Sequence, residues 1–146
     1  MTGLGHSEHC VIYSDGGARG NPGPAAAGGV VLRDDGSVAA QVSEYLGIAT
    51  NNVAEYRALL LILQRALDDG CKRADVCLDS ELVVKQLNGV YRVKDAKIVP
   101  LHLQARKLLR QFEEARVTYV PREKNKRADK LVNAALDARL KKDAAQ

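Results

Sequence analysis

Residues 38–70, VAAQVSEYLGIATNNVAEYRALLLILQRALDDG, contain the change of periodicity that decides the fold. The segment Val38–Tyr45 follows the turn Asp34–Ser37, whose Asp-Gly pair is typical of a hairpin, and it is predicted to be a strand. From Asn52 onward, apolar residues recur every three or four positions until Asp69-Gly70, which predicts a helix that ends at a glycine. The chain passes here from sheet to helix, which indicates a mixed α/β domain.

The other elements are predicted from the same signals on both sides of this segment. Strands are predicted at Cys10–Ser14, Val30–Leu32, Ala74–Leu78 and Arg116–Val120, and helices at Glu81–Leu87, after Pro100 and at Lys126–Lys141. Because helices separate the later strands, these strands are expected to run parallel to the first one through right-handed crossovers. The predicted fold class is α/β, with a five-stranded mixed sheet of three antiparallel and then two parallel strands, flanked by helices.

The chain has 146 residues and a mass of 15.8 kDa, which fits one domain. We expect this domain to span residues 11–141, with tails at 1–10 and 142–146. No apolar run approaches the ~20 residues that cross a bilayer, and the N-terminus lacks the features of a signal peptide. We therefore expect a cytoplasmic protein without a membrane partner. Nothing in the sequence indicates an obligate protein partner, so we also expect a monomer.

The three cysteines, Cys10, Cys71 and Cys77, form no CxxC pair and are odd in number. This pattern favours neither a disulfide framework nor a zinc site. We therefore expect all three to be reduced thiols.

The charge is distributed unevenly along the chain, whose net charge is +4. Residues 1–84 contain six basic and eleven acidic residues, whereas residues 85–130 contain thirteen basic and five acidic ones. A basic region in a protein with a pI of about 9.0 is typical of a polyanion partner, although the same residues could simply solvate helix faces. Five Tyr and one Phe are too few for a base-stacking platform.

Four carboxylates stand at the boundaries of predicted elements. Asp15 and Asp79 follow two strands, and Glu55 and Asp129 lie near the starts of two helices. If the two strands are neighbours, their carboxyl ends place Asp15 and Asp79 side by side, and the helices bring the other two. Carboxylates so close together raise each other's pKa unless cations lie among them. Hard oxygen ligands with open positions favour Mg²⁺ or Mn²⁺.

Three of the four carboxylates also have a purely structural interpretation, whereas Asp15 is harder to explain in this way. Asn52 and Glu55 have the spacing of a capping box, and Asp79 could cap the short helix. Asp129 is favourable near any helix N-terminus. Four carboxylates at such boundaries in one small domain, next to a basic region, favour a metal site over separate structural roles.

The glycine-rich segment Gly16–Pro24 invites comparison with a nucleotide phosphate loop. It lacks the Gly-Lys-Ser/Thr of that loop, and a strand rather than a helix follows it. A loop that lets the backbone approach a large polyanion closely fits these residues better.

Four motif blocks together resemble the type 1 ribonucleases H in order and spacing. They are Asp15-Gly16-Gly17 with Gly20 to Pro24, then Thr50 to Glu55, then Asp79-Ser80, and then Asn125 with Ala128-Asp129. The resemblance runs from about Val11 to Leu140. It implies a ribonuclease H-like fold and an endonuclease that cleaves the RNA strand of RNA/DNA hybrids, leaving 5′-phosphate and 3′-hydroxyl ends.

The resemblance also implies which residues form the site. Two ions, Mg²⁺ or Mn²⁺, would be held by Asp15, Glu55, Asp79 and Asp129, which would be the catalytic residues. The hybrid would be contacted by Gly16, Gly17, Asn21, Thr50, Asn51, Asn52, Ser80 and Asn125.

The sequence departs from the family pattern in two places. Residues 88–100 are too short for the basic handle that well-known members carry, so the chain looks like the short branch of the family. The loop before Asp129 contains no histidine. Arg122 and Lys124 are therefore candidate accessory residues in that loop, unless it is only a solvated turn.

Two other functions fit the same residues less well. A different two-metal nuclease on this fold, such as an exonuclease, would differ by cutting at chain ends. A non-catalytic nucleic-acid-binding module is disfavoured because all four carboxylates are present.

Overall fold

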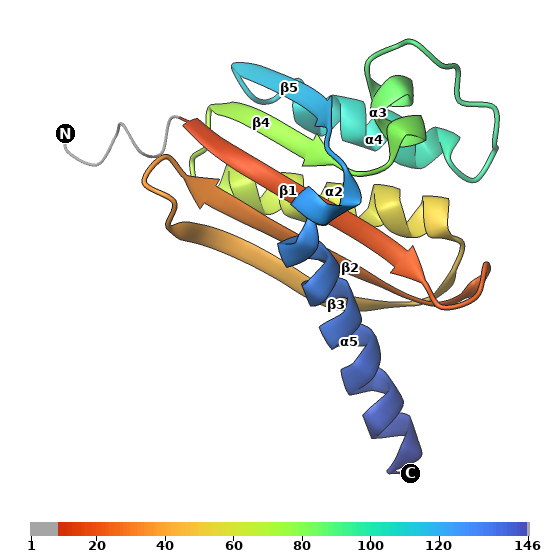
Figure 1. Cartoon of the computed structure of the whole chain (residues 1–146). Helices are drawn as coiled ribbons and strands as arrows, with labels where there is room; N and C mark the ends of the chain where they lie inside the picture. The colour runs from red at the N-terminus through yellow and green to blue at the C-terminus, as the bar shows by residue number, and fades with distance from the viewer. Residues whose placement is uncertain (1–8, 146) are drawn as a thin grey trace.

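A five-stranded mixed sheet lies at the centre of the structure, a computed structural model that describes residues 9–145. The strands are β1 (His9–Ala18), β2 (Gly23–Arg33), β3 (Val38–Ala49), β4 (Arg73–Leu78) and β5 (Glu114–Tyr119). Their order across the sheet is β3-β2-β1-β4-β5 (Figure 1). β1, β2 and β3 are antiparallel, and β4 and β5 run parallel to β1. The predicted fold class is confirmed.

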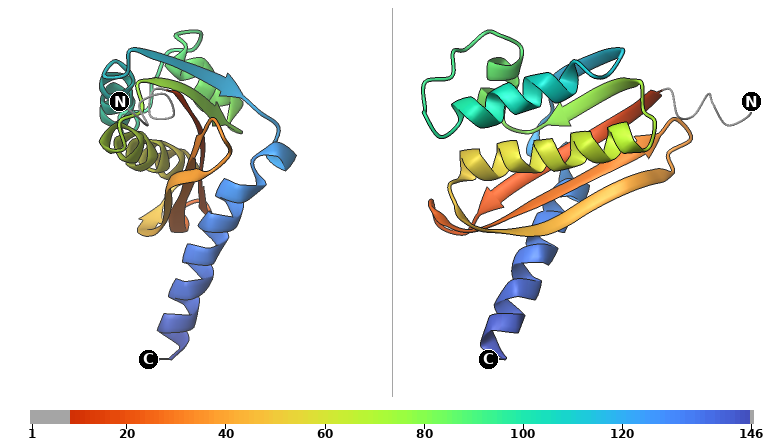
Figure 2. Two further views of the ribbon diagram at one scale, coloured as in Figure 1. Left: turned by 90° about the vertical axis from the view of Figure 1, so that its left-hand side faces the viewer. Right: turned by 180° about the vertical axis from the view of Figure 1, so that it is seen from behind.

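Helices cover both faces of this sheet. They are α2 (Asn51–Asp68), α3 (Glu81–Leu87), α4 (Val99–Leu109) and α5 (Lys126–Ala144), with the short 3₁₀ helix η1 (Arg122–Lys124) before α5. α2 and α4 lie against one face, and α5 crosses the other face and projects beyond it (Figure 2). No helix within residues 9–145 is long and apolar enough to span a membrane.

Several element boundaries differ from the prediction. The glycine-rich segment is mostly strand, because β1 continues to Ala18 and β2 begins at Gly23, which leaves only a tight turn between them. β1 already begins at His9, inside the predicted tail 1–10, and residues 1–8 of that tail lie outside the described residues. α5 continues to Ala144, beyond the predicted end at 141, and residue 146 is not described.

The small side chains of β2 let helices approach the sheet from both sides. A Cβ at Gly28 would overlap the backbone of α5 at Ala128 and Val132, whereas a Cβ at Gly29 would press against Ile62 on α2. Successive residues of a strand point to opposite faces, so the two glycines serve opposite helices. This close approach fixes α2 and α5, which carry Glu55 and Asp129.

The expectation of three reduced thiols is wrong, because a disulfide joins Cys10 and Cys71, leaving Cys77 free. An odd number of cysteines excludes complete pairing but permits one bridge. α2 packs along β1 and returns the chain to the start of that strand, which brings Cys71 next to Cys10. The bridge connects residues 61 positions apart in the sequence.

We expect Cys71→Ser to lower the free energy of unfolding of the oxidised protein by about 2–4 kcal/mol, because the bridge closes a long loop in the unfolded chain. Urea unfolding with and without a thiol reductant measures this difference. Cys77→Ser is the matched control and should respond to reductant as the parent does. A parent protein whose stability does not change with reductant would show that the bridge contributes nothing.

Candidate active site

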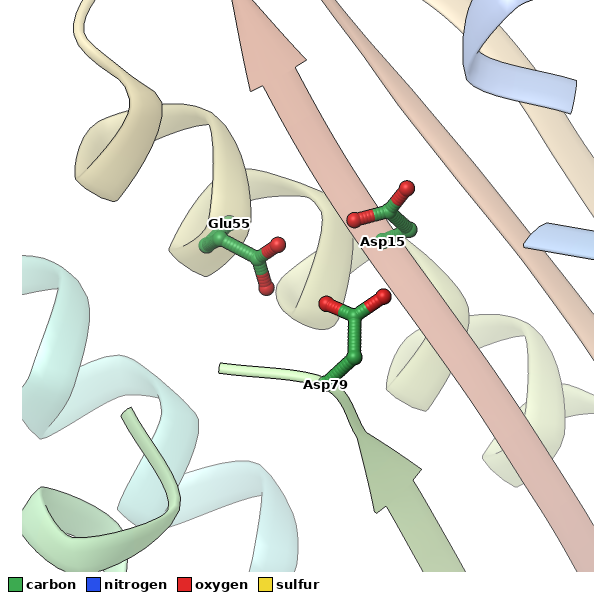
Figure 3. Close-up of side chains that lie close together, drawn as sticks. All are labelled: Asp15, Glu55 and Asp79. Atoms are coloured by element: carbon green, nitrogen blue, oxygen red, sulfur yellow. The ribbon is translucent and has the colours of Figure 1, made fainter. Parts of the chain in front are cut away.

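Three carboxylates from three elements converge at one edge of the sheet. Asp15 lies on β1, Glu55 on α2, and Asp79 directly after β4, and their side chains point toward one another (Figure 3). One carboxylate oxygen from each lies within 4.8 Å of the others. β1 and β4 are parallel neighbours, so their carboxyl ends place Asp15 and Asp79 together as predicted.

Gly16 allows Glu55 to join this group. A Cβ at position 16 would overlap the carbonyl group of Ala54, so only glycine lets α2 pack so tightly on β1. The Gly16 N–H donates to Glu55 Oε1 at 3.3 Å. The glycine thus determines both the position of the helix and the orientation of the carboxylate.

The structural alternatives for Glu55 and Asp79 are resolved by the residues that cap the helices. Thr50 Oγ1 accepts the N–H of Val53 at 3.2 Å, so threonine caps α2. Ser80 Oγ accepts the N–H of Val83 at 3.3 Å and caps α3. Neither carboxylate serves as a helix cap, and both are directed into the shared site.

Asn125 donates a hydrogen bond to Asp79 and so helps to fix its position. Its Nδ2 donates to Ser14 O at 2.9 Å and to Asp79 Oδ2 at 3.1 Å, and the residue is only 1% exposed. The sequence predicted that Asn125 contacts substrate. Its burial and its two bonds show that it joins the end of β1 to the residue after β4, and its contact with substrate stays a prediction.

Asp129 lies beside Asp15 but outside the group of three carboxylates. It lies in the first turn of α5 and lines the same cleft, but it is not within the group whose oxygens lie within 4.8 Å. Its charge is nevertheless one of those that raise the pKa of Asp15. The structure therefore brings all four predicted carboxylates to one cleft and three of them into direct proximity.

Burial and like charge act together on this group. Asp15 and Glu55 are only 8% and 7% exposed. Burial, followed by the charges of Asp79 and Asp129, raises the pKa of Asp15 to about 7. Burial and the charges of Asp15 and Asp79 raise the pKa of Glu55 well above its ordinary range. Among the described residues, Glu55 Oε2 has no hydrogen-bond partner. A buried, unpartnered carboxylate oxygen in an all-oxygen donor set fits a hard divalent cation.

A cleft of about 410 Å³ opens above the carboxylates. Of the predicted contact and accessory residues, those that line it are Gly16, Gly17, Asn51, Asn52, Ser80 and Arg122. Those that do not are Asn21, Thr50, Lys124 and Asn125. Two further polar residues, Arg19 and Asn133, also line the cleft. Neither residue was predicted from the sequence, although Arg19 lies between the two parts of the first motif block and Asn133 follows Asp129 by one helical turn.

The raised pKa values predict how stability depends on pH without metal. Between about pH 4 and 7 the folded protein retains protons on Asp15 and Glu55 that the unfolded chain releases, so stability should fall as pH rises through this range. Asp15→Asn removes one of these charges. In EDTA at pH 8 it should raise the free energy of unfolding by about 1–3 kcal/mol. Urea unfolding at pH 5.5 and 8 measures the effect.

The comparison between parent and variant is needed because His9, whose pKa is also raised, likewise makes stability fall as pH rises. Asp34 and Asp75 accept hydrogen bonds from its ring and raise its pKa. Asp143→Asn, at the exposed end of α5, is the matched control for loss of one negative charge. If the stability of the parent and of Asp15→Asn depended equally on pH, the pH dependence could not be assigned to this carboxylate cluster.

Comparisons with known proteins identify a family and several relatives of this chain. Residues 13–135 match the protein family described as reverse transcriptase-like. The chain is 46% identical over 136 residues to the bifunctional protein Rv2228c of Mycobacterium tuberculosis, covering 92% of this chain and 37% of that protein. It is also 46% identical over 125 residues to ribonuclease HI of Halobacterium salinarum, covering 86% of this chain and 63% of that protein. The chain thus spans between about one third and two thirds of these relatives.

Solved structures match over nearly their full length. The N-terminal RNase H domain of Rv2228c superposes with a TM-score of 0.88 at 45% identity, covering 92% of this chain and 98% of that one. LC11-RNase H1, isolated from compost and solved in complex with an RNA/DNA hybrid, superposes with a TM-score of 0.84 at 41% identity. That match covers 90% of this chain and 99% of the other.

Proposed function

Because the chain belongs to the type 1 ribonuclease H family, within the reverse transcriptase-like proteins, we propose that it is an endonuclease that hydrolyses the RNA strand of RNA/DNA hybrids. The observation that carries this proposal is the convergence of Asp15, Glu55 and Asp79 within 4.8 Å, with one buried carboxylate oxygen left unpartnered. The solved complex of a 41% identical relative with such a hybrid supports the choice of substrate.

The four carboxylates would hold two divalent ions, Mg²⁺ or Mn²⁺. Ions bound there would lower the pKa of a water molecule and stabilise the leaving 3′ oxygen, so that cleavage leaves 5′-phosphate and 3′-hydroxyl ends. The chain's own contribution is to hold the carboxylates in place. Gly16 and Asn125 orient Glu55 and Asp79, and the close packing of α5 on Gly28 brings in Asp129.

Selection of RNA would come from polar groups on the walls of the cleft. Asn51 and Asn52 are exposed at the N-terminus of α2 and line the cleft beside Glu55. Asparagine side chains can both donate to and accept from a 2′-hydroxyl, the group that distinguishes RNA from DNA. Basic residues of the segment 85–130 would meet the phosphates of the DNA strand, which predicts salt-sensitive but sequence-independent binding.

The direct test is cleavage of three labelled substrates: an RNA/DNA hybrid, duplex DNA and duplex RNA. With Mg²⁺ or Mn²⁺ the hybrid should be cut internally in its RNA strand, and EDTA should abolish the reaction. Product ends are read by ligation and by phosphatase sensitivity. Duplex DNA cut as fast as the hybrid, or products released only from chain ends, would identify a different nuclease.

Asp79→Asn ties this activity to the site, because it removes a negative ligand and keeps the side-chain shape. The rate of hybrid cleavage should fall by orders of magnitude while the thermal unfolding temperature changes little. A variant that retains more than about a tenth of the parent rate, a loss below ~1.4 kcal/mol of barrier, would place the reaction elsewhere.

Arg122 is proposed to assist turnover from the wall of the cleft. Its guanidinium keeps its proton at neutral pH, so it can stabilise negative charge but cannot act as a base. Arg122→Ala should slow turnover roughly three- to thirty-fold, or about 0.6–2 kcal/mol. Lys124→Ala on the same turn lies outside the cleft and should cost less. Single-turnover and steady-state rates together distinguish a chemical role from product release, and equal, unchanged rates in both would exclude a role.

A further inference from the structure

Arg19 joins the turn after β1 to the helix that carries Asp129. Its Nη2 donates to Asn133 Oδ1 at 3.0 Å and lies 2.8 Å from Asp137 Oδ1. Both acceptors belong to α5 and are one helical turn apart. The guanidinium therefore connects two walls of the cleft that are more than a hundred residues apart in the sequence.

Asn133 continues this connection to Asp129. Its Nδ2 lies 3.1 Å from Asp129 O and 3.5 Å from Asp129 Oδ2. A guanidinium has hydrogen-bond donors only, so the Asn133 amide must turn its oxygen toward Arg19. Its NH₂ group then faces Asp129. The reversed amide would direct its oxygen at oxygens that can only accept. Arg19 thus selects the amide orientation that favours the ionised carboxylate.

The other side of the same turn is attached to α2. The Ala18 N–H donates to Asn51 Oδ1 at 2.9 Å, and the Asn51 N–H donates to Asn21 Oδ1 at 3.0 Å. The turn between β1 and β2 therefore contacts both of the helices that supply carboxylates to the cleft. α2 contributes Glu55, and α5 contributes Asp129.

We propose that Arg19 is a positioning residue which, through the amide of Asn133, orients the Asp129 carboxylate for metal binding. This inference rests on the proposed function. Arg19 itself need touch neither metal nor substrate. Residues that orient a metal-holding side chain commonly contribute about ten- to a hundredfold to metal affinity.

The test compares Arg19→Ala with the parent and with Arg139→Ala. Arg139 is the control because it is an arginine of α5 itself: its Nε donates to Asp143 and its guanidinium carbon lies 4.6 Å from the centroid of the Tyr45 ring, and within the described residues no hydrogen bond joins it to Asn133 or Asp129. Arg19→Ala should raise the Mn²⁺ concentration for half-maximal hybrid cleavage by about ten- to a hundredfold. It should leave the KM for hybrid at saturating Mn²⁺ within about threefold. Calorimetric titration with Mn²⁺ alone should show weaker binding in the same variant, and Arg139→Ala should match the parent in all three.

Two further variants test the route through Asn133. Arg19→Lys keeps a head group that only donates, so it should restore most of the metal affinity. In an Asp129→Asn background, Arg19→Ala should have no further effect on Mn²⁺ binding, because the carboxylate it orients is gone.

Three results would overturn the inference. Weaker hybrid binding with unchanged metal dependence would make Arg19 a phosphate contact instead. An undiminished effect in the Asp129→Asn background would show that it acts elsewhere, and parent-like Mn²⁺ binding in Arg19→Ala would show that it does not act at all. If the parent fails to cut hybrid, the proposed function is wrong, while the Mn²⁺ titration still decides the role of Arg19.

Discussion

The mutual repulsion of buried carboxylates is the constraint to which the rest of the molecule responds. Asp15, Glu55 and Asp79 lie close enough to oppose one another's ionisation, and two of them are almost excluded from water. Such a group is unfavourable without cations, so the packing of the surrounding helices and strands must stabilise it. Gly16 and Gly28 permit that packing by letting helices contact strands at backbone distance.

Neutral amides rather than cations join the pieces around this acidic group. Asn125 joins the end of β1 to Asp79 after β4. Asn51 joins α2 to the end of β1 and to Asn21 in the turn that follows. A lysine or arginine in the position of Asn125 would neutralise Asp79 permanently and compete with a metal ion. An amide supplies donors without charge, which leaves the negative potential available to a divalent cation. Arg19 is a cation that lines the same cleft, but its hydrogen bond goes to Asn133 rather than to Asp129.

Sequence patterns predicted the order of the elements and the four carboxylates because both depend on local signals. Periodicity located α2, and Asp79 followed from its place at the end of a strand. Other features depend on contacts between distant segments and left no local signal. The pairing of Cys10 with Cys71 requires α2 to lie along β1, and the burial of Asn125 requires the two neighbouring strands to end together. The capping-box alternative for Asn52 and Glu55 could not be settled by spacing alone, because it takes the structure to show that Thr50 caps α2.

The adjacent glycines of β2 let the two long helices pack closely on opposite faces of the same strand. Gly28 lets the backbone of α5 contact the strand directly, and Gly29 makes room for the Ile62 side chain of α2 on the opposite face. Both contacts are tight, so β2 resists displacement of either helix toward the sheet. Glu55 and Asp129 belong to these two helices, so two adjacent residues without side chains on one strand help to set the positions of two of the four carboxylates.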